Sequence, residues 1–544
     1  MARSGRAGAS LKFLRSRPFL LTPLLAGVAL RIVQYASDTS FWFDEFSVAR
    51  NIVHRSAEQL AFQPLGYNQV APVGFMLTEK LINETKATSD LALRLFPFLC
   101  GLLSLALFCL LALRLLDGYA VPFALASFAI GIPFIRYTTE LKQYGLDVAA
   151  LLALSLLAIR LRDEDSTAAR CLIVGLAGLV FVWFSQAAVL VMAGIGAAIV
   201  LSWFLERDVP MRRAALITVP IWALASAAAT IEALHRMTPE TRSFMHEFWK
   251  GRHGFFPWPP QQAGDFLWLW NQVTELLGDP VLRYRWPALY GVLAILGLVV
   301  LGRRNRFAAL ILFGPFLVRV LAAVAQQYPI RTRVVLFFVP GLLILIAEAA
   351  EWIRKSASRL HPMLGGAVMA ALFFPPILAI VYKPPPYWTE DYKSVLSFVR
   401  TNRRADDPVY VYVYSYEALE RYGPEYGLPP GSYFVGGCWR DDLRAYLRDV
   451  DRYRGVPRLW LITSGVPEFN EAGQNIRSYL GTIGVLKGSK SVPSARLFAP
   501  VSADLYDLSD PTHLAAASAS SFPLKPPGVL RPICLDFVFP DHNN

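Results

Sequence analysis

The sequence predicts a polytopic α-helical membrane protein with a small α/β domain at its C-terminal end. The chain is 54% hydrophobic and only 17% charged, whereas soluble proteins are about one-quarter charged. Between residues 18 and 382 the apolar residues form repeated blocks, each close to the ~20 residues that cross a bilayer as a helix. Beyond that region the composition becomes that of a soluble domain. These observations exclude an ordinary soluble enzyme.

Eleven apolar blocks are predicted to be membrane spans. With the N terminus in the cytoplasm, the cytoplasmic segments hold 18 Lys and Arg in 55 residues, against 14 in 128 external residues. This asymmetry follows the positive-inside rule. The asymmetry predicts a cytoplasmic N terminus. Because the number of spans is odd, the C-terminal domain is then expected to be extracytoplasmic. The predicted spans are residues 18–37, 91–113, 119–135, 145–159, 171–183, 189–205, 214–233, 287–301, 307–325, 334–352 and 362–382.

The net charge of +12 belongs to the same pattern. The basic residues lie between the apolar blocks, where they set the orientation of the spans. We therefore expect membrane lipid, and no nucleic acid, as a partner. The Ala- and Arg-rich composition and the compact loops indicate a bacterial inner membrane.

The chain is expected to form two domains. Residues 1–382 make up the transmembrane domain, which carries two long external loops at 38–90 and 234–286. Long loops with aromatic content are usually functional rather than simple connections. The second loop contains five of the thirteen Trp, which are expected mainly to anchor it at the membrane interface.

Residues 383–544 are predicted to form the extracytoplasmic α/β domain. They contain no P-loop and no G-x-G-x-x-G motif, so no catalytic site is predicted there. Cys438 and Cys534 lie in this domain and either form a disulfide or remain free thiols, depending on the compartment. The expected strands are Val409–Tyr414 and Arg458–Thr463, and the expected helices are 415–422 and 439–453.

The sharpest motif is Phe41-Trp42-Phe43-Asp44-Glu45, just outside the first span. A carboxylate in this position can accept the proton of an attacking hydroxyl, and partial burial beside the bilayer keeps it close to an apolar substrate. Alternatively, Asp44 caps a short helix along the membrane surface and Glu45 favours the dipole of its first turn. The spacing alone leaves both interpretations open.

The second motif is the turn before the fourth span, residues 137–147. On a helix that enters the membrane, Glu140, Tyr144 and Asp147 would share one face and Lys142 would point elsewhere. These side chains either bind substrate or are solvated at the interface. Because Asp147 is expected about one turn inside the apolar zone, we favour the functional interpretation.

The third feature is cationic. Arg319 is predicted inside the ninth span, and Arg331 and Arg333 follow in the next external turn. Arginine at membrane depth is unfavourable unless it is paired, and a phosphate at the bilayer surface is a suitable partner. The alternatives are a salt bridge to an internal carboxylate or snorkelling toward headgroups. The same alternatives apply to Arg94 at the start of the second span.

Histidines gather in the second loop, but their spacing predicts no metal site. His235, His246 and His253 lie near Glu247, at separations that match no standard zinc pattern such as H-E-x-x-H.

Together these motifs resemble those of the GT-C glycosyltransferases. The likeness is to bacterial members related to protein O-mannosyltransferases (glycosyltransferase family 39) and to aminoarabinose or galacturonic acid transferases that act on lipid A. It is most specific at Trp42-Phe43-Asp44-Glu45 and at Glu140-Leu141-Lys142-Gln143-Tyr144. The resemblance implies a GT-C fold and transfer of a sugar from a polyprenyl-phosphate carrier on the non-cytoplasmic face, with inversion at the anomeric carbon. No nucleotide donor, no cofactor and no divalent metal is expected.

The resemblance also assigns roles to residues. Asp44, with Glu45 beside it, stands at the family's acidic position in the first loop, and Glu140 stands at the second acidic position. A polyprenyl phosphate leaves readily, so the enzyme mainly needs cations that stabilise charge on the phosphate oxygens. We therefore expect Asp44 to be the base. The expected phosphate-binding residues are Lys142, Arg331, Arg333 and Arg319, and the expected substrate-lining residues are Trp42, Tyr67, Arg94 and Tyr144.

The sequence is also compatible with several other functions. A transporter or flippase would use intramembrane charges as a translocation path, although no repeat symmetry is visible. A polysaccharide polymerase or ligase would share the lipid-linked donor. A nonenzymatic assembly or sensor protein would use the C-terminal domain to bind a partner. The acceptor is expected to be a hydroxyl of a glycan, a lipid or a protein.

Overall fold

The computed structural model describes residues 20–86, 89–163, 167–207, 209–278, 282–439, 442–465, 471–493 and 499–524. The chain forms two compact units. The membrane unit comprises Met1–Ser37, Ile52–Leu65 and Gln69–Pro386. The tail unit comprises Asp38–Asn51, Gly66–Asn68 and Tyr387–Asn544. Part of the first external loop therefore belongs to the same unit as the C-terminal domain.

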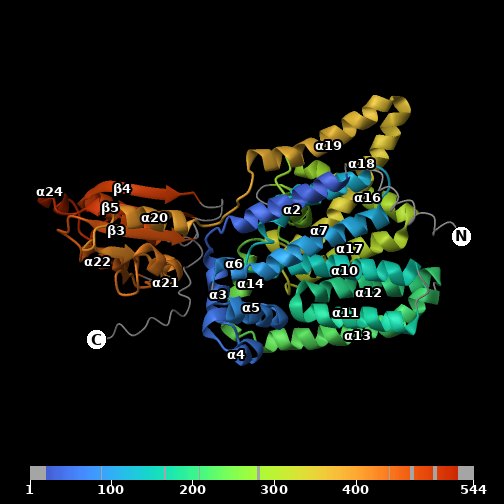
Figure 1. The fold of residues 1–544 in the computed structure, drawn as a ribbon, viewed down its shortest axis with the longest axis horizontal. Helices are drawn as coiled ribbons and strands as arrows, with labels where there is room; N and C mark the ends of the chain where they lie inside the picture. Colours follow the sequence, from blue (N-terminus) through green and yellow to red (C-terminus); the bar gives the residue numbers. More distant parts are fainter. Residues whose placement is uncertain are drawn as a thin grey trace. The chain divides into compact units, whose positions relative to one another are not determined.

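The membrane unit is built from long apolar helices (Figure 1). Among the described residues, eight helices are long and apolar enough to cross a membrane, and three shorter apolar helices accompany them. All eleven coincide with the predicted spans, so the chain is a multi-pass membrane protein. The helices are α2 (Leu21–Ala36), α7 (Leu95–Leu115), α8 (Ala120–Ile130), α10 (Tyr144–Asp163), α11 (Ala168–Phe184), α12 (Ala187–Glu206), α13 (Val209–His235), α16 (Pro287–Arg304), α17 (Arg306–Val324), α18 (Val339–Leu360) and α19 (Pro362–Tyr382).

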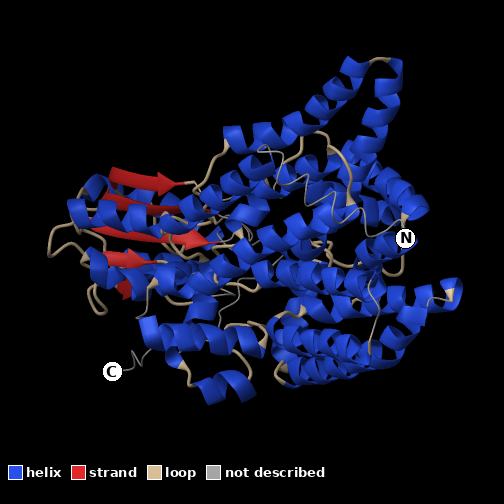
Figure 2. Ribbon diagram, turned by 45° about the vertical axis from the view of Figure 1, so that its right-hand side comes forward, coloured by secondary structure: helices blue, strands red, loops and turns tan. Residues whose placement is uncertain are grey.

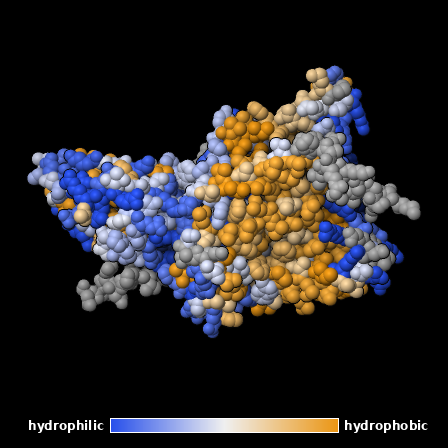
Figure 3. All heavy atoms as spheres, viewed as in Figure 1, coloured by the Kyte–Doolittle hydropathy of each residue, from blue (hydrophilic) through white to orange (hydrophobic). Residues whose placement is uncertain are grey.

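Apolar side chains cover much of the face of this helical bundle that is seen in Figure 3. Leu172, Leu224 and Val292 are examples of exposed side chains on three different spans. In a soluble protein such a surface would drive aggregation, whereas a bilayer solvates it. The apolar exterior therefore agrees with the membrane assignment.

Shorter helices connect the spans. One of them caps itself locally, since Ser56 begins α4 with a reciprocal capping box to Gln59. The connecting helices are α3 (Phe43–His54), α4 (Ala57–Phe62), α5 (Val73–Lys86), α6 (Asp90–Leu93), α9 (Ile132–Arg136), α14 (Pro239–Lys250), α15 (Trp268–Leu277) and the 3-10 helices η2 (Ala263–Leu267) and η3 (Thr332–Phe338).

The tail unit contains the β-structure of the described chain (Figure 2). Its described strands form a five-stranded sheet in the order β2-β1-β3-β5-β4. β1 pairs in parallel with β2 and β3, whereas β5 is antiparallel to both β3 and β4. The strands are β1 (Val409–Val411), β2 (Phe434–Val435), β3 (Leu459–Gly465), β4 (Val485–Val492) and β5 (Ala499–Asp507).

Helices pack on this sheet and complete the predicted α/β domain. They are α20 (Tyr392–Asn402), α21 (Tyr416–Tyr422), α22 (Leu443–Asp451), α23 (Glu471–Ile483), α24 (Pro511–Leu514) and the 3-10 helices η4 (Val413–Ser415) and η5 (Gly423–Tyr426). Cys438 is disulfide-bonded, and Cys534, the other cysteine expected in this domain, lies outside the described residues.

Candidate functional site

The first predicted carboxylates lie in the first turn of α3, within the tail unit. The backbone carbonyl of Trp42 accepts hydrogen bonds from the amides of Glu45 (2.8 Å) and Phe46 (3.0 Å), so Trp42 precedes the helix. Asp44 therefore lies inside the first turn rather than at the capping position. Its side chain is half-buried and that of Glu45 is fully buried. This position favours both carboxylates through the helix dipole.

The apolar side of α3 does not rest on a membrane surface at Phe46, in contrast to the predicted surface helix. The Phe46 ring packs edge-on against Tyr392 (5.8 Å between ring centroids) and Tyr422 (5.7 Å), both in the tail. Hydrophobic burial against protein has replaced the expected contact with lipid. The spacing of the apolar residues predicted the helix but could not identify what covers it.

Tyr67, predicted to line the substrate, belongs to the same unit. The guanidinium of Arg50 lies over its ring at 4.8 Å from the centroid. Arg50 is on α3, one residue beyond the buried Ala49, so Tyr67 packs against the helix that carries Asp44.

The second predicted carboxylate, Glu140, lies in the membrane unit, in the turn between α9 and α10. Because α10 begins only at Tyr144, the prediction that Glu140, Tyr144 and Asp147 share a helical face is wrong for Glu140. Tyr144 and Asp147 are on α10, and Ser185 donates a hydrogen bond to Asp147. Residues 137–143, between α9 and α10, form turns and bends.

A compact cluster of cations and phenols surrounds this turn. Arg136 Nε donates to Glu140 Oε1 at 3.0 Å, and Arg333 Nε donates to the Tyr144 hydroxyl at 2.9 Å. The rings of Tyr137 and Tyr144 meet edge-on at 5.5 Å. Arg333 is on η3, so the cluster joins segments from two distant parts of the chain. It is the clearest candidate site in the membrane unit.

The electrostatics of this cluster favour the charged form of Arg136. Burial acts to lower the pKa of Arg136, but the neighbouring Glu140 carboxylate and Tyr137 outweigh burial and raise that pKa overall. Arg333 opposes this rise because it carries the same charge. The cluster thus holds two guanidinium groups close enough to influence each other, which suits an anion with several oxygens.

Lys142 is also buried beside the turn. Its ammonium donates to Gln69 Oε1 at 2.7 Å. The two residues are 73 positions apart, and both belong to the membrane unit. Gln69 thus orients one of the predicted phosphate-binding cations.

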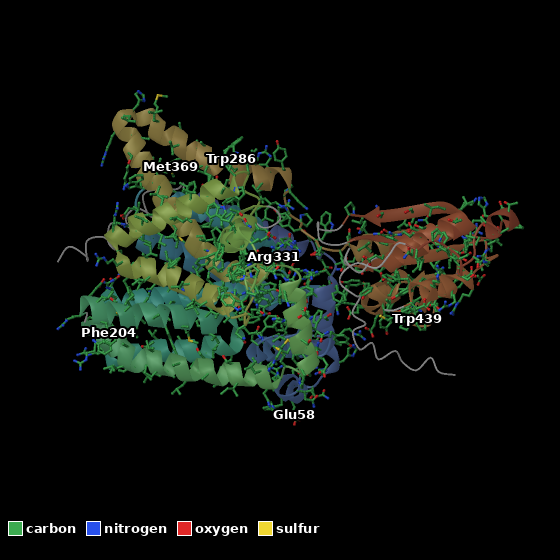
Figure 4. The ribbon with its side chains drawn as sticks, turned by 180° about the vertical axis from the view of Figure 1, so that it is seen from behind. Glu58, Phe204, Trp286, Arg331, Met369 and Trp439 are labelled. Atoms are coloured by element: carbon green, nitrogen blue, oxygen red, sulfur yellow. The ribbon has the colours of Figure 1, made fainter. Side chains whose placement is uncertain are left out.

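The other predicted cations have different surroundings. Arg331, labelled in Figure 4, pairs with Glu275 on α15 and contacts Gln272 at 3.5 Å. Arg94 is buried at the start of α7.

Arg319 is fully buried, and its guanidinium donates hydrogen bonds to backbone carbonyls. It donates to the carbonyls of Pro329 and of Val334, the latter at 3.2 Å, and lies over the Tyr328 ring at 3.7 Å. Both hydrogen bonds come from Nη2, whereas Nε and Nη1 are buried without a hydrogen-bond partner among the described residues. The two bonds favour a structural role, in which Arg319 holds the segment that leads to Arg333.

Arg136 and Gln69 are site residues that were not predicted from the sequence. The separation of four residues between Arg136 and Glu140, the usual spacing of a local ion pair, is a signal that could have identified Arg136. Gln69 carries no signal of its own, because its contact with Lys142 arises only when the first loop folds back.

Comparisons with known proteins address the fold. No protein-family model and no curated protein matches this sequence. The oligosaccharyltransferase of Archaeoglobus fulgidus, in a complex with Zn and sulfate, superposes with a TM-score of 0.52 and 13% identity over 89% of this chain and 72% of its own. ArnT from Cupriavidus metallidurans bound to undecaprenyl phosphate gives a TM-score of 0.49 and 13% identity over 89% of this chain and 97% of its own.

The likeness to the oligosaccharyltransferase confirms the predicted fold class. This chain has the GT-C fold. Within the GT-C fold the predicted site residues are divided between the two units. Trp42, Asp44, Glu45 and Tyr67 belong to the tail unit, and Arg94, Glu140, Lys142, Tyr144, Arg319, Arg331 and Arg333 belong to the membrane unit.

Proposed function

We propose that this chain is a membrane glycosyltransferase that moves a sugar from a polyprenyl-phosphate carrier to a hydroxyl acceptor, with inversion at the anomeric carbon. The observation that carries the proposal is the cluster of Arg136, Arg333, Tyr144 and Glu140 at the entrance of α10 in a GT-C fold. The Archaeoglobus protein that shares the fold is an oligosaccharyltransferase, which supports a glycosyl transfer reaction.

The cations of the membrane unit suit the leaving group. In the reaction, the bond between the anomeric carbon and the phosphate oxygen breaks, and negative charge develops on the phosphate. Arg333 and Lys142 would stabilise this charge, and Tyr144 and Gln69 would hold them in position. Arg136 would add to the positive potential while its pairing with Glu140 fixes its place.

Asp44 is the proposed base. The acceptor oxygen forms the new bond to the anomeric carbon, and its proton passes to the Asp44 carboxylate. An inverting displacement needs such a base on the face of the sugar ring opposite the leaving phosphate. Half-burial in the first turn of α3 keeps the carboxylate accessible while its neighbours hold the helix.

The proposed location is a bacterial inner membrane, with the N terminus in the cytoplasm. The spans are joined by ion pairs at their predicted cytoplasmic ends, where the basic residues are concentrated. The concentration of basic residues at these ends supports the predicted orientation, in which the C-terminal domain lies outside the cytoplasm. The pairs are Arg114–Asp163, Arg162–Glu206 and Arg304–Glu348.

Substitution of Asp44 tests the proposal. We expect Asp44→Asn, at unchanged expression, to reduce transfer by about 100-fold or more, because the amide cannot accept the hydroxyl proton. Mass spectrometry of envelope glycans and lipids from cells with and without the chain would identify the sugar and its acceptor, and then quantify the variant. If the product is missing while the lipid-linked donor still reaches the outer face, the chain is a transferase; in cells that lack a flippase the donor itself would stay on the cytoplasmic face.

A matched control comes from the same loop. Glu58 is an exposed carboxylate on α4, labelled in Figure 4, and Glu58→Gln should leave transfer at the wild-type level. If Asp44→Asn retained most of its transfer, Asp44 would not be the base and the proposed mechanism would be wrong.

A further inference from the structure

We propose that the C-terminal domain positions the acidic helix of the first loop. Glu390 is the positioning residue, and it fixes the orientation that Asp44 needs to act as the base. The inference rests on the proposed function of Asp44 as the base. It gives the C-terminal domain a role within the reaction, although that domain carries no catalytic motif of its own.

The tail first fixes the segment that leads into α3. Lys393 Nζ donates to both the backbone oxygen and the Oδ2 of Asp38, each at 2.8 Å. The backbone amide of the same lysine donates to Ser40 Oγ at 2.9 Å. One residue at the start of α20 therefore holds two residues of the first loop.

The next contacts reach the N terminus of α3 itself. The first amides of a helix have no acceptor within the helix, so they need an outside partner. Phe43 N, the first amide of α3, donates to Glu390 Oε2 at 2.8 Å. Two residues earlier, Phe41 N donates to the Tyr422 hydroxyl at 2.8 Å. Tail side chains thus supply the acceptors that a local capping residue would normally provide.

The far end and the apolar side of the helix are held as well. Arg50 pairs with Glu420 at 3.1 Å and approaches Glu417 at 3.6 Å. Between the two ends, the Phe46 ring lies against Tyr392 and Tyr422. Contacts at both ends and along one side leave α3 little freedom to rotate, so the direction of Asp44 is set by the tail.

Glu390 is anchored in the core of the tail. It is 1% exposed, and Tyr392, two positions further along the chain, is fully buried. The Tyr392 hydroxyl contacts Ser464 Oγ, which also lies 3.0 Å from Ser415 Oγ. The segment that accepts the Phe43 amide is therefore tied to β3 of the sheet by buried hydrogen bonds, and such buried networks are rigid.

This anchoring matters because Asp44 directly follows the residue that Glu390 holds. Misplacement of a catalytic group by about 1 Å can reduce a rate about 100-fold. Loss of the Glu390 acceptor would leave the amide of Phe43 without its partner and release the first turn of α3. The effect should fall on turnover rather than on binding of the lipid-linked donor.

Hydrogen exchange of the full chain in nanodiscs tests the contact itself. We expect Glu390→Ala to accelerate exchange of the amides in residues 41–51 roughly tenfold, because an acceptor at the helix N terminus is lost. Glu390→Gln keeps an acceptor oxygen and should restore slow exchange. Tyr422→Phe, which removes only the hydroxyl bonded to Phe41 and keeps the ring, should accelerate exchange in the same segment and serves if Glu390→Ala does not fold.

Kinetics of the same variants test the consequence. The donor would be an organic extract of polyprenyl-linked sugars from cells that lack this chain. We expect Glu390→Ala to lower kcat by roughly 10- to 100-fold with an unchanged KM for the extract, and Glu390→Gln to recover kcat. Asp504→Asn is the matched control, because Asp504 is a buried tail carboxylate that pairs with Arg477. It should leave both exchange of residues 41–51 and kcat unchanged.

Two results would overturn the inference. One is wild-type exchange of residues 41–51 in both Glu390→Ala and Tyr422→Phe, and the other is a wild-type kcat in Glu390→Ala despite faster exchange. Failure of the proposed function has a different signature, since Asp44→Asn would then retain transfer while exchange in the Glu390 variants still reported the contact.

Discussion

Arg333 illustrates, at the scale of the single residue, how the candidate site is assembled. The residue type and its place after the ninth span were sufficient to predict a phosphate-binding cation. Its hydrogen bond to the Tyr144 hydroxyl, across 189 positions of sequence, was not predictable. Glu140 was also predicted at the site, but the structure pairs it with Arg136 and places it in a turn instead of on a helix.

Removal of the Arg333 charge should weaken the stabilisation of negative charge on the donor phosphate. We expect Arg333→Gln to lower transfer about 100-fold, because one preorganised charged donor is lost, while Arg333→Lys should retain part of the activity. Transfer assays with the extracted lipid-linked donor measure both variants. Arg285→Gln, at an exposed arginine of the second loop, is the control and should behave as wild type. Normal kcat and KM in Arg333→Gln would remove Arg333 from the site.

Pairs of helices, at the scale of the element, approach closely where a glycine on one helix faces the backbone of the other. Without water between apolar helices, association in a membrane depends on close packing and small residues. A Cβ at Gly194 on α12 would lie 2.2 Å from the backbone nitrogen of Pro315 on α17. At Gly297 on α16 it would lie 1.8 Å from the carbonyl oxygen of Leu345 on α18. No side chain fits at either crossing.

Gly194→Ala should therefore destabilise the bundle, because the backbone of α17 must move. We expect a loss of about 1–3 kcal/mol, seen as a lower unfolding temperature of the purified protein in detergent. Gly196→Ala on the same helix is the matched control. Its Cβ would meet Val219 at an ordinary 3.7 Å, so it should leave the unfolding temperature nearly unchanged. Equal unfolding temperatures for the two variants would show that the backbones of α12 and α17 are not in close contact at Gly194.

Each of the two units of the whole molecule has its own core of buried apolar side chains. The tail buries carboxyl groups beside α3: burial raises the pKa of Glu390 to about 7 and that of Glu417 to about 8, although Arg50 opposes the shift of Glu417. The stability of the tail should consequently depend on pH in the neutral range.

The direction of this dependence follows from the raised pKa values. Both carboxyls have an ordinary pKa of 4.5, so their stabilising contribution is complete below that pH and is lost as the pH rises through about 7 and 8. We expect the free energy of opening of the tail in the full chain to fall between about pH 4.5 and 8, by at most about 1.4 kcal/mol per pH unit for each group, and to level off above pH 8. Hydrogen exchange of the tail amides at several pH values measures this free energy, once the observed rates are corrected for the pH dependence of the intrinsic exchange rate. The double variant Glu390→Gln and Glu417→Gln should flatten the profile, and an unchanged slope would contradict the assignment.

The sequence by itself determined the membrane architecture, the α/β character of the tail and the position of the acidic motif at Asp44. These depend on local properties: a span needs a run of apolar residues as long as the bilayer is thick, and a strand or helix has its own period. Tertiary structure alone decided the partners. Phe43 and Glu390 are 347 positions apart, and Tyr144 and Arg333 are 189 apart. Such contacts carry no local signal, because they depend on which surfaces the folded chain brings together rather than on the pattern within any one segment.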